Sequence, residues 1–287
     1  MKSDRKIQTV LFGASESLDY FIDNTKHERD FLACVDNNSE LWGKFINEVR
    51  IIAPDEIERL EFDQIVILTQ WCKEVIKQLV NDLGIRRDRI LVPDRRLLGK
   101  PMFQNEQMQQ SGNAIIDLLM QKAINGNIPL VVDMGTLLGI IRDGRLIPWD
   151  SDIDFALSID FMEILYKITL DIFELENLPF KIGFPKRMLK DDRLVQIEFS
   201  CFCGSDNILN FPVTINARES IGEESVWVAF DGLWKAPKKH FDQISNFFYN
   251  QSIIQTPSYP LEYLNYMYGS DWSIPKADFT YDDYPNN

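Results

Sequence analysis

The sequence has few of the residues from which most metal and nucleophile sites are built. Its 287 residues include two histidines and four cysteines, namely His27, His240, Cys34, Cys72, Cys201 and Cys203. The cysteines form neither a CxxC motif nor a Cys/His cluster of zinc type, so we expect free core thiols in a reducing compartment. The shortage of histidine argues against a histidine-based metal site and against a Ser-His-Asp triad.

Long apolar runs and an excess of basic charge are also absent. No run approaches the ~20 apolar residues that a spanning helix needs, and the segment from Met1 to Phe12 lacks the pattern of a signal peptide. We therefore expect a cytoplasmic protein, with a peripheral contact at the inner face of the membrane left open. Of the net charge of −14, residues 1–100 carry −2 (16 basic, 18 acidic) and residues 101–287 carry −12 (14 basic, 26 acidic). Such a chain lacks the basic footprint of a nucleic-acid-binding protein.

The composition is that of a soluble globular protein, and the length suggests about two domains. Strand patterns alternate with helix patterns over the first hundred residues, which predicts a parallel sheet with helices on its faces. The predicted strands are 9–13, 31–35, 48–52, 64–69 and 89–92, and the helices are 15–24 and 72–83. A polar stretch at 93–110 reads as a linker. We predict a Rossmann-like domain at residues 1–100 and a second domain at 101–287, in which helices 106–125, 136–142, 159–174 and 261–268 accompany strands 128–132, 152–157 and 194–202.

The segment from Gly135 to Asp154 carries the chemistry. Gly135 and Thr136 lie where a predicted strand turns into a helix. A glycine there lets the backbone approach a ligand closely. We expect Thr136 to cap the helix and to present its hydroxyl and backbone N–H groups to a phosphate.

Three aspartates follow at alternate positions, Asp150, Asp152 and Asp154. On a strand their carboxylates would share one face, while Ile153 and Phe155 would point into the core. Carboxylates so placed repel each other unless a cation lies among them. Mg²⁺ or Mn²⁺ fits this arrangement and promotes phosphoryl-type transfer. Acidic triplets also occur in ordinary surface turns, but the preceding Gly-Thr turn favours an active site.

The run Gly135-Thr-Leu-Leu-Gly139, Arg142 and Ile147-Pro-Trp-Asp-Ser-Asp-Ile-Asp154 resembles the signature of the LicD/fukutin-type family. A second match, Tyr259-Pro-Leu-Glu-Tyr-Leu-Asn-Tyr-Met-Tyr-Gly-Ser-Asp-Trp272 with Pro275, is similar to the tail of that family. The resemblance covers roughly residues 106–280. It implies a nucleotidyltransferase fold with a mixed sheet. It also implies an enzyme that moves a phosphorylated alcohol, such as phosphocholine or ribitol phosphate, from a CDP-activated donor to a glycan acceptor.

The resemblance also assigns residues. Gly135, Thr136 and, within the same motif, Gly139 would lie at the donor, and Asp152 and Asp154 would hold the metal. Glu198 is the candidate for a third carboxylate, where the family more often has aspartate, and Asp231 is the fallback. Arg142 would clamp the donor phosphates or simply end a helix. Trp149 would stack on the donor or pack against the loop. Asp150 would be the general base or a second metal ligand.

Other functions compete with this one. The same metal site would serve a nucleotidyltransferase that moves an NMP from an NTP to a small molecule or protein, and a non-catalytic sugar-nucleotide-binding protein would keep the aspartates as remnants. Val10 to Ser17 resembles a degenerate Rossmann turn, and Asp36 ends the next strand where a ribose-binding acid would lie. Because Ala14 and Ser15 replace expected glycines, we favour a structural or docking role for the first domain over nucleotide binding. An oxidoreductase is the least favoured of the hypotheses. The alcohol, the acceptor and the oligomeric state leave no signal in the sequence.

Overall fold

The computed structural model describes residues 5–15, 17–69, 71–99, 102–175, 178, 180–203, 209–229, 234–276 and 285. The chain divides into two compact units. The first comprises residues 1–100 with 275–284, and the second comprises residues 101–274 with 285–287.

The first unit contains a sheet in the order β3-β4-β2-β1-β5-β6. All neighbouring strands run parallel except β3, which pairs antiparallel with β4 at one edge. The strands are β1 (Ile7–Phe12), β2 (Arg29–Val35), β3 (Phe45–Ile46), β4 (Val49–Ile52), β5 (Gln64–Ile67) and β6 (Ile90–Leu91). The helices are α1 (Ser17–Thr25), α2 (Cys72–Lys77) with its π-helical continuation η3 (Gln78–Asp82), and the 3-10 turns η1 (Ser39–Leu41), η2 (Pro54–Arg59), η4 (Arg87–Arg89) and η5 (Arg95–Leu97).

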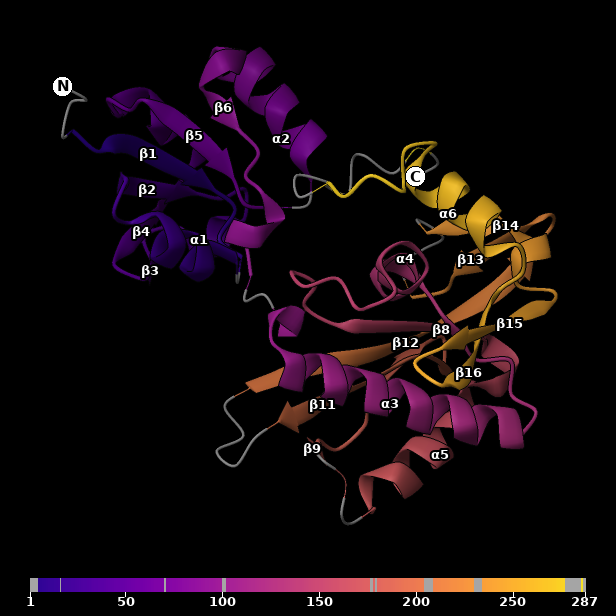
Figure 1. The fold of residues 1–287 in the computed structure, drawn as a ribbon. Coiled ribbons are helices and arrows are strands. Elements are labelled where there is room, and N and C mark those ends of the chain that lie inside the picture. The colour runs from indigo at the N-terminus through magenta and orange to yellow at the C-terminus, as the bar shows by residue number, and fades with distance from the viewer. Residues whose placement is uncertain are drawn as a thin grey trace. The chain divides into compact units, whose positions relative to one another are not determined.

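Both faces of this sheet are buried, each under a different helix. Val10 and Phe12 of β1 pack with Val75 of α2, whereas Leu11, which points the other way, packs with Phe21 of α1. This alternation follows from the period of two in a strand. Figure 1 shows α1 and α2 on opposite sides of the strands. The predicted Rossmann-like parallel sheet is confirmed.

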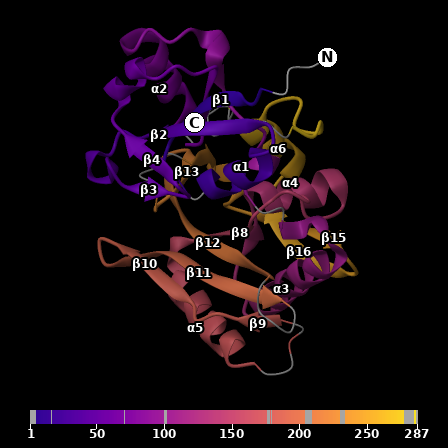
Figure 2. The ribbon, with the colours of Figure 1, turned by 90° about the vertical axis from the view of Figure 1, so that its left-hand side faces the viewer.

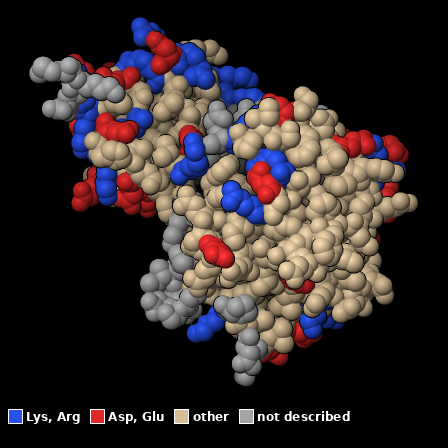
Figure 3. All heavy atoms as spheres, viewed as in Figure 1, with Lys and Arg blue, Asp and Glu red and all other residues tan. Residues whose placement is uncertain are grey.

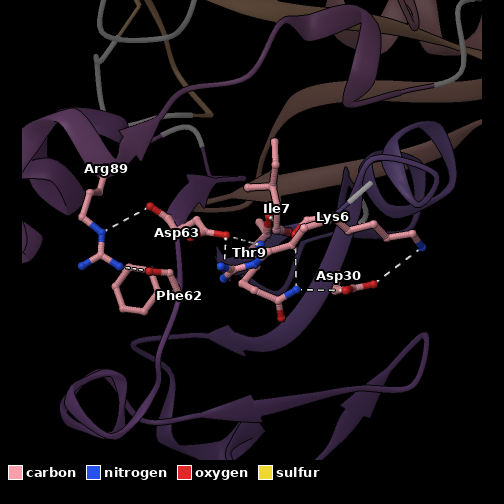
Figure 4. A network of polar contacts seen from close by, with 9 residues as sticks. Lys6, Ile7, Thr9, Asp30, Phe62, Asp63 and Arg89 are labelled. Atoms are coloured by element: carbon pink, nitrogen blue, oxygen red, sulfur yellow. Dashed lines mark hydrogen bonds and ion pairs between the residues drawn. The ribbon is translucent and has the colours of Figure 1, made fainter. Parts of the chain in front are cut away.

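Polar contacts close the sheet at the amino ends of β1 and β5 (Figure 4). The Asp63 carboxylate accepts a hydrogen bond from the backbone N–H of Gln8 at 2.8 Å, and the backbone carbonyl of Asp63 accepts one from Arg89 Nε at 3.2 Å. The guanidinium of Arg89 also stacks on the Phe62 ring, 4.0 Å from its centroid. These groups satisfy backbone polar atoms at this edge and leave the opposite, carboxyl edge of the sheet for other contacts.

The second unit contains a mixed sheet with the path β10-β11-β12-β13-β14. β8 pairs parallel with β12 and antiparallel with β7, and β9 pairs with β11. The strands are β7 (Val131–Val132), β8 (Ile153–Ser158), β9 (Phe180–Ile182), β10 (Lys186–Lys190), β11 (Arg193–Cys203), β12 (Leu209–Ile221), β13 (Glu224–Trp227) and β14 (Lys235–Pro237), beside a hairpin of β15 (Ile244–Tyr249) and β16 (Ser252–Pro257). The helices are α3 (Glu106–Asn125), α4 (Met134–Asp143), α5 (Met162–Phe173), α6 (Pro260–Tyr268), and the turns η6 (Met102–Gln104), η7 (Ile159–Phe161) and η8 (Lys238–His240).

The two faces of this sheet differ in polarity. Ile153 and Phe155 of β8 lie beside Val213 and Ile215 of β12, and all four are fully buried. The alternate residues form the other face, where Asp154 lies beside Thr214. Figures 1 and 2 show α3 and α5 on one side of the sheet and α4 on the other. The apolar face therefore builds the core, and the polar face lies toward α4.

Several local expectations are confirmed and others need correction. α3 begins and ends where predicted, and the four cysteines are free and buried. β8 begins only at Ile153, so Asp150 and Asp152 lie in the loop before it, and the strand argument applies to Asp154 alone. Strands β9, β10, β12 and β14 and the β15–β16 hairpin were not predicted from the sequence.

Charge is distributed differently over the two units. In the view of Figure 3, basic and acidic side chains are interspersed over the first unit, whereas the second unit presents a mostly uncharged surface.

Among the described residues, none of the helices combines the length and apolar character that crossing a bilayer requires.

Candidate active site

The site is built around the first turn of α4. Asp133 is the N-cap residue, and its Oδ1 accepts a hydrogen bond from the Met134 N–H at 2.9 Å. The first intrahelical bond runs from Leu137 N to Asp133 O at 3.0 Å. Met134 has a φ of +48°, a strained conformation for a non-glycine residue. The chain thus turns sharply out of β7, and the amides of Gly135 and Thr136 precede the first intrahelical bond.

Asp133 is completely buried and held by two distant side chains. Arg218 Nη2 on β12 donates to Asp133 Oδ2 at 3.0 Å, and the Tyr263 hydroxyl on α6 donates to Oδ1 at 2.5 Å. Arg218 also donates to the Tyr263 oxygen at 3.1 Å and stacks on the Phe241 ring at 4.0 Å. A buried ion pair needs further hydrogen bonds to its groups. Here the Tyr263 hydroxyl and the Ser225 carbonyl supply some of them, whereas Arg218 Nε is buried without a hydrogen-bond partner among the described residues. This network fixes the N-terminus of α4 to the sheet and to α6.

Sequence reasoning missed this network. Asp133 lies two residues before the first matched run, and Tyr263 lies inside the C-terminal motif. Arg218 lies 85 residues from Asp133 in the chain, and Tyr263 lies 130 residues from it. Only the position of Tyr263 in the tail motif could have pointed to it.

Asp154 is tied to the same helical turn through its backbone. Its N–H donates to Thr136 Oγ1 at 2.9 Å, and its carbonyl accepts from Asp133 N at 3.0 Å. The predicted capping role of Thr136 was therefore wrong, because Asp133 caps the helix and Thr136 lies inside it. The hydroxyl of Thr136 instead joins α4 to β8 and sets the position of Asp154 relative to Gly135.

Asp150 lies against the same turn from the other side. A Cβ atom added to Gly135 would lie 2.3 Å from Asp150 Oδ2, so the carboxylate fills the space that a side chain would take. Asp150 Oδ1 accepts from the Ser151 N–H at 3.2 Å. The glycine is thus required for the close approach of a carboxylate to the positive end of α4.

The loop between α4 and Asp150 is pinned from two helices. A Cβ on Gly139 would lie 2.7 Å from the Arg145 carbonyl oxygen and 2.9 Å from Ile147 N, so this glycine lets the loop lie on α4. From α3, Gln109 Nε2 donates to the Leu146 carbonyl at 2.8 Å, and its Oε1 accepts from Leu146 N at 3.2 Å. Gly139 therefore contacts the loop that carries Asp150.

The predicted acidic residues are only partly brought together. Asp152 and Asp154 are both half-buried at the start of β8, and Asp152 Oδ1 accepts from the Ser151 hydroxyl at 3.3 Å. Glu198 lies on the same sheet face, but Thr214 stands between it and Asp154 in the strand register. Two strand spacings place the Cα atoms about 10 Å apart, and Lys186 Nζ lies 4.0 Å from Glu198 Oε1. Among the described residues, no three His, Cys, Asp or Glu side chains form a group that could hold a metal ion, so Glu198 does not complete such a cluster.

The other predicted site residues either lie apart from the first turn of α4 or fall outside the residues that the structure describes. Arg142 is at the far end of α4, where its guanidinium donates to both carboxylate oxygens of Asp143 at 2.9 and 2.7 Å. Trp149 is half-buried in the loop that carries Asp150. Asp231 lies outside the described residues. The arrangement favours the structural alternative for Arg142, a cation near a helix C-terminus.

A buried histidine packs against the Asp133 network at Tyr263. His240 is completely buried, and its Nδ1 donates to the Ser258 carbonyl at 2.7 Å. Its ring centroid lies 5.5 Å from that of Tyr263. Burial lowers the pKa of His240, against the opposing effect of its bond to Ser258. This residue packs behind Tyr263, and its lowered pKa predicts that stability depends on pH.

Two family models match the chain. Residues 127–258 match LicD/FKTN/FKRP, nucleotidyltransferase domain, which confirms the resemblance read from the motif. Residues 5–91 match C2185-like, N-terminal. No curated protein sequence matches the chain.

Solved structures resemble the chain only distantly. UDP-D-quinovosamine 4-dehydrogenase from Vibrio fischeri is 17% identical with a TM-score of 0.26, over 31% of this chain and 78% of that one. ANT(2")-Ia in complex with adenylyl-2"-tobramycin is 16% identical with a TM-score of 0.32, over 60% of this chain and 83% of that one. UDP-N-acetylglucosamine 3-dehydrogenase GnnA from Acidithiobacillus ferrooxidans is 10% identical with a TM-score of 0.28, over 97% and 93%. Likenesses this weak do not indicate a shared activity.

Proposed function

We propose a transfer reaction, because residues 127–258 match the LicD/FKTN/FKRP nucleotidyltransferase domain. The chain moves a phosphorylated alcohol, such as phosphocholine or ribitol phosphate, from a CDP-activated donor to a hydroxyl group of a cell-surface glycan or its precursor. The reaction depends on Mg²⁺ or Mn²⁺ and takes place at the first turn of α4.

One observation carries the proposal. Asp154 is bonded through its backbone to Asp133 and Thr136, while the Asp150 carboxylate lies against Gly135. Carboxylates and the N-terminus of a helix are thereby held side by side. A helix N-terminus favours a phosphate, and nearby carboxylates favour the cation that accompanies it. A donor substrate that carries two phosphates needs both the helix N-terminus and the cation.

The carboxylates at this turn suit a metal ion that the protein ligates only in part. Mg²⁺ is commonly bound through one or two carboxylates and completes its shell with waters and substrate phosphates. Asp152 and Asp154 would supply the carboxylates. When bound, the metal would neutralise charge on the donor phosphates. The rest of the site positions the donor and takes up the acceptor proton.

In the proposed reaction, the acceptor oxygen attacks the phosphorus that bears the alcohol. A new phosphorus–oxygen bond forms, the bond from this phosphorus to the bridging oxygen of the diphosphate breaks, and CMP leaves with that electron pair. The acceptor proton passes to a carboxylate, for which Asp150 is the candidate because it lies at the same helical turn. The Gly135 and Thr136 amides would orient the donor phosphates, and Trp149 would contact the donor from the adjoining loop.

A donor screen tests the proposal. The full chain is incubated with Mg²⁺ and CDP-choline, CDP-ribitol, CDP-glycerol or each of the four NTPs, and CMP and pyrophosphate are measured by chromatography. We expect CMP from one CDP-alcohol, lost with EDTA and lost in Asp154→Asn. The control is Asp160→Asn, at the η7 turn beyond the same strand. Direct donor binding by calorimetry is measured in parallel, because turnover without acceptor can be slow.

Each outcome is decisive. Pyrophosphate released from an NTP would replace the proposal with transfer of an NMP. Full CMP release by Asp154→Asn would remove Asp154 from the site. Failure of every donor both to react and to bind would leave a non-catalytic protein.

A further inference from the structure

The first unit contains a cavity at the carboxyl ends of its central strands. Its volume is about 390 Å³, and its lining includes Gly13 after β1, Asp36 after β2, and Trp71 and Glu74 at α2. The strand order runs from β1 outward to β2 and β4 and then returns to β5 on the other side of β1. Open parallel sheets bind ligands at such a reversal of strand order, outside the carboxyl ends of the strands.

In the turn after β1, several of the groups that could bind a pyrophosphate already make hydrogen bonds. The Gly13 N–H donates to the Val35 carbonyl at 2.8 Å, and the Ala14 N–H donates to Asp36 Oδ2 at 2.8 Å. The other carboxylate oxygen of Asp36 accepts from the Asn38 N–H at 2.8 Å. The Ser15 hydroxyl donates to the Leu68 carbonyl at 2.9 Å. A phosphate placed here would find these donors satisfied and the Asp36 carboxylate beside it.

The charge of the lining also disfavours an anion. Asp36 and Glu74 contribute carboxylates, and the described lining contains no Lys, Arg or His. A cleft lined by charges of one sign repels ligands of that sign. A dinucleotide or a nucleoside diphosphate is therefore a poor occupant, although the surrounding sheet is of the type that holds them in other proteins.

Other groups of the lining suit an uncharged ring with hydroxyl groups. Trp71 exposes 43% of its surface, so part of its aromatic side chain is accessible at the cavity. The side chains of Asn37 and Gln78 donate to each other at 3.0 and 2.9 Å, which holds both carboxamides in one orientation at the cavity. Glu74 is exposed and can accept hydrogen bonds from hydroxyl groups. Cations of the quaternary ammonium type are usually held by several aromatic faces, and among the described lining residues the exposed ring is that of Trp71.

We propose that this cavity binds an uncharged sugar ring, stacked on Trp71 with its hydroxyl groups on Glu74 and the Asn37–Gln78 pair, and that it excludes phosphorylated ligands. The ring would come from a glycan or from the ribose of a nucleoside, since both offer neighbouring hydroxyl groups. This binding does not require the transfer reaction proposed for the second unit, so either proposal can fail alone.

Saturation-transfer NMR on the full chain tests the proposal, because it detects weak binding of small ligands directly. The probes are the methyl glycosides of glucose, galactose and N-acetylglucosamine, then cytidine and uridine, then UDP and NAD⁺. We expect saturation of ring protons in at least one uncharged probe. Trp71→Ala should weaken that binding about fivefold or more, the scale of one lost aromatic contact. Tyr20→Ala is the matched control, because Tyr20 is 40% exposed on α1 and lies outside the lining.

The probes also separate the two sources and the competing ligands. Binding of a methyl glycoside without the nucleosides identifies a glycan site, and the reverse identifies a nucleoside site. UDP bound more tightly than uridine, or NAD⁺ bound more tightly than every uncharged probe, would overturn the proposal. So would silence from all uncharged probes, or a signal that Trp71→Ala leaves unchanged while circular dichroism shows the variant folded. Glu74→Gln should weaken the sugar signal without enabling UDP to exceed uridine, because Asp36 remains.

Discussion

Tyr263 connects the C-terminal motif to the N-terminus of α4 through a single hydroxyl group. That group donates to Asp133 and accepts from Arg218, and all three residues are buried. The motif around Tyr263 therefore has a physical reason to accompany the aspartate motif, although 130 residues separate Tyr263 from Asp133. It supplies one of the groups that hold the N-cap of α4 in place.

Tyr263→Phe should reduce both stability and turnover. The change leaves a buried carboxylate with one donor fewer, which costs about 1–3 kcal/mol in the free energy of unfolding. Because Asp133 positions Gly135, we expect kcat for CMP release to fall about tenfold, equivalent to 1.4 kcal/mol of transition-state stabilisation. Urea unfolding and donor turnover measure the two effects. Tyr259→Phe, at a position 65% exposed, is the control, and equal effects of the two variants would contradict the role of the buried hydroxyl.

Arg218→Met should cost more stability than Tyr263→Phe. It leaves the buried Asp133 carboxylate without its cation, and such losses cost about 3–5 kcal/mol. Adding Asp133→Asn to Arg218→Met removes the isolated charge and should restore part of that stability. Urea unfolding of both single variants and the double variant forms the cycle that measures this. Strictly additive effects would mean that the two side chains do not interact.

The sequence could predict those residues whose role depends on their spacing within one short motif. Gly135 and Asp154 belong to one motif, and the structure brings both to the first turn of α4. Arg218 has no such signal, because its partner lies across the sheet and nothing in β12 marks it as buried and ionic. Glu198 remains a prediction, and its place in the sheet shows what local spacing does not determine. Its flanking apolar residues predicted a strand correctly, but which strand lies next to β8 depends on the topology of the whole sheet.

At the scale of elements, α4 is shaped by two glycines with different tasks. Gly135 admits the end of a side chain, the Asp150 carboxylate, whereas Gly139 admits the backbone of the loop at Arg145 and Ile147. A carboxylate can rotate away from a new methyl group, but loop backbone pinned by Gln109 cannot. The same substitution should therefore have opposite consequences at the two sites.

Gly135→Ala should leave stability nearly unchanged and remove most activity, because alanine suits a helix but displaces Asp150. Gly139→Ala should lower the free energy of unfolding by about 1–3 kcal/mol, the usual cost of overpacking. Thermal unfolding and CMP release measured on both variants separate the effects. If Gly135→Ala keeps full turnover, the position of Asp150 seen here is not needed for the reaction.

The start of α4 also shows a limit of prediction from local sequence patterns. The predicted helix 136–142 located α4 within two residues at each end. The Gly-Thr pair drew the predicted cap to Thr136 because threonine is a good cap. The ion pair with Arg218 favours Asp133 over Thr136 as the cap, because it holds the Asp133 carboxylate at the helix end. This contact joins residues far apart in the sequence, so a local pattern does not reveal it.

At the scale of the whole molecule, two units with separate cores should respond separately to pH. His240 lies in the second unit, and burial lowers its pKa below that of an exposed histidine. Above about pH 6.5, the usual pKa of the imidazole, it is neutral in both folded and unfolded chains and has no effect. As the pH falls below that value, the unfolded chain binds a proton that the folded chain does not, and stability is lost. Burial raises the pKa of Asp117 in the same unit, which has the opposite sign, because the folded chain then binds this proton more readily than the unfolded chain as the pH falls.

Differential scanning calorimetry from about pH 7.5 to about pH 5.5 checks this, since histidine is the side chain that normally titrates in that window. We expect two transitions, with the one that belongs to the second unit moving to lower temperature as the pH falls. Tyr263→Phe identifies that transition, because it lowers the same one. The other histidine, His27, has 68% of its side chain exposed, so His27→Gln should keep the shift. A shift that His27→Gln abolishes, or that moves both transitions equally, would place the pH dependence outside His240 and its buried surroundings.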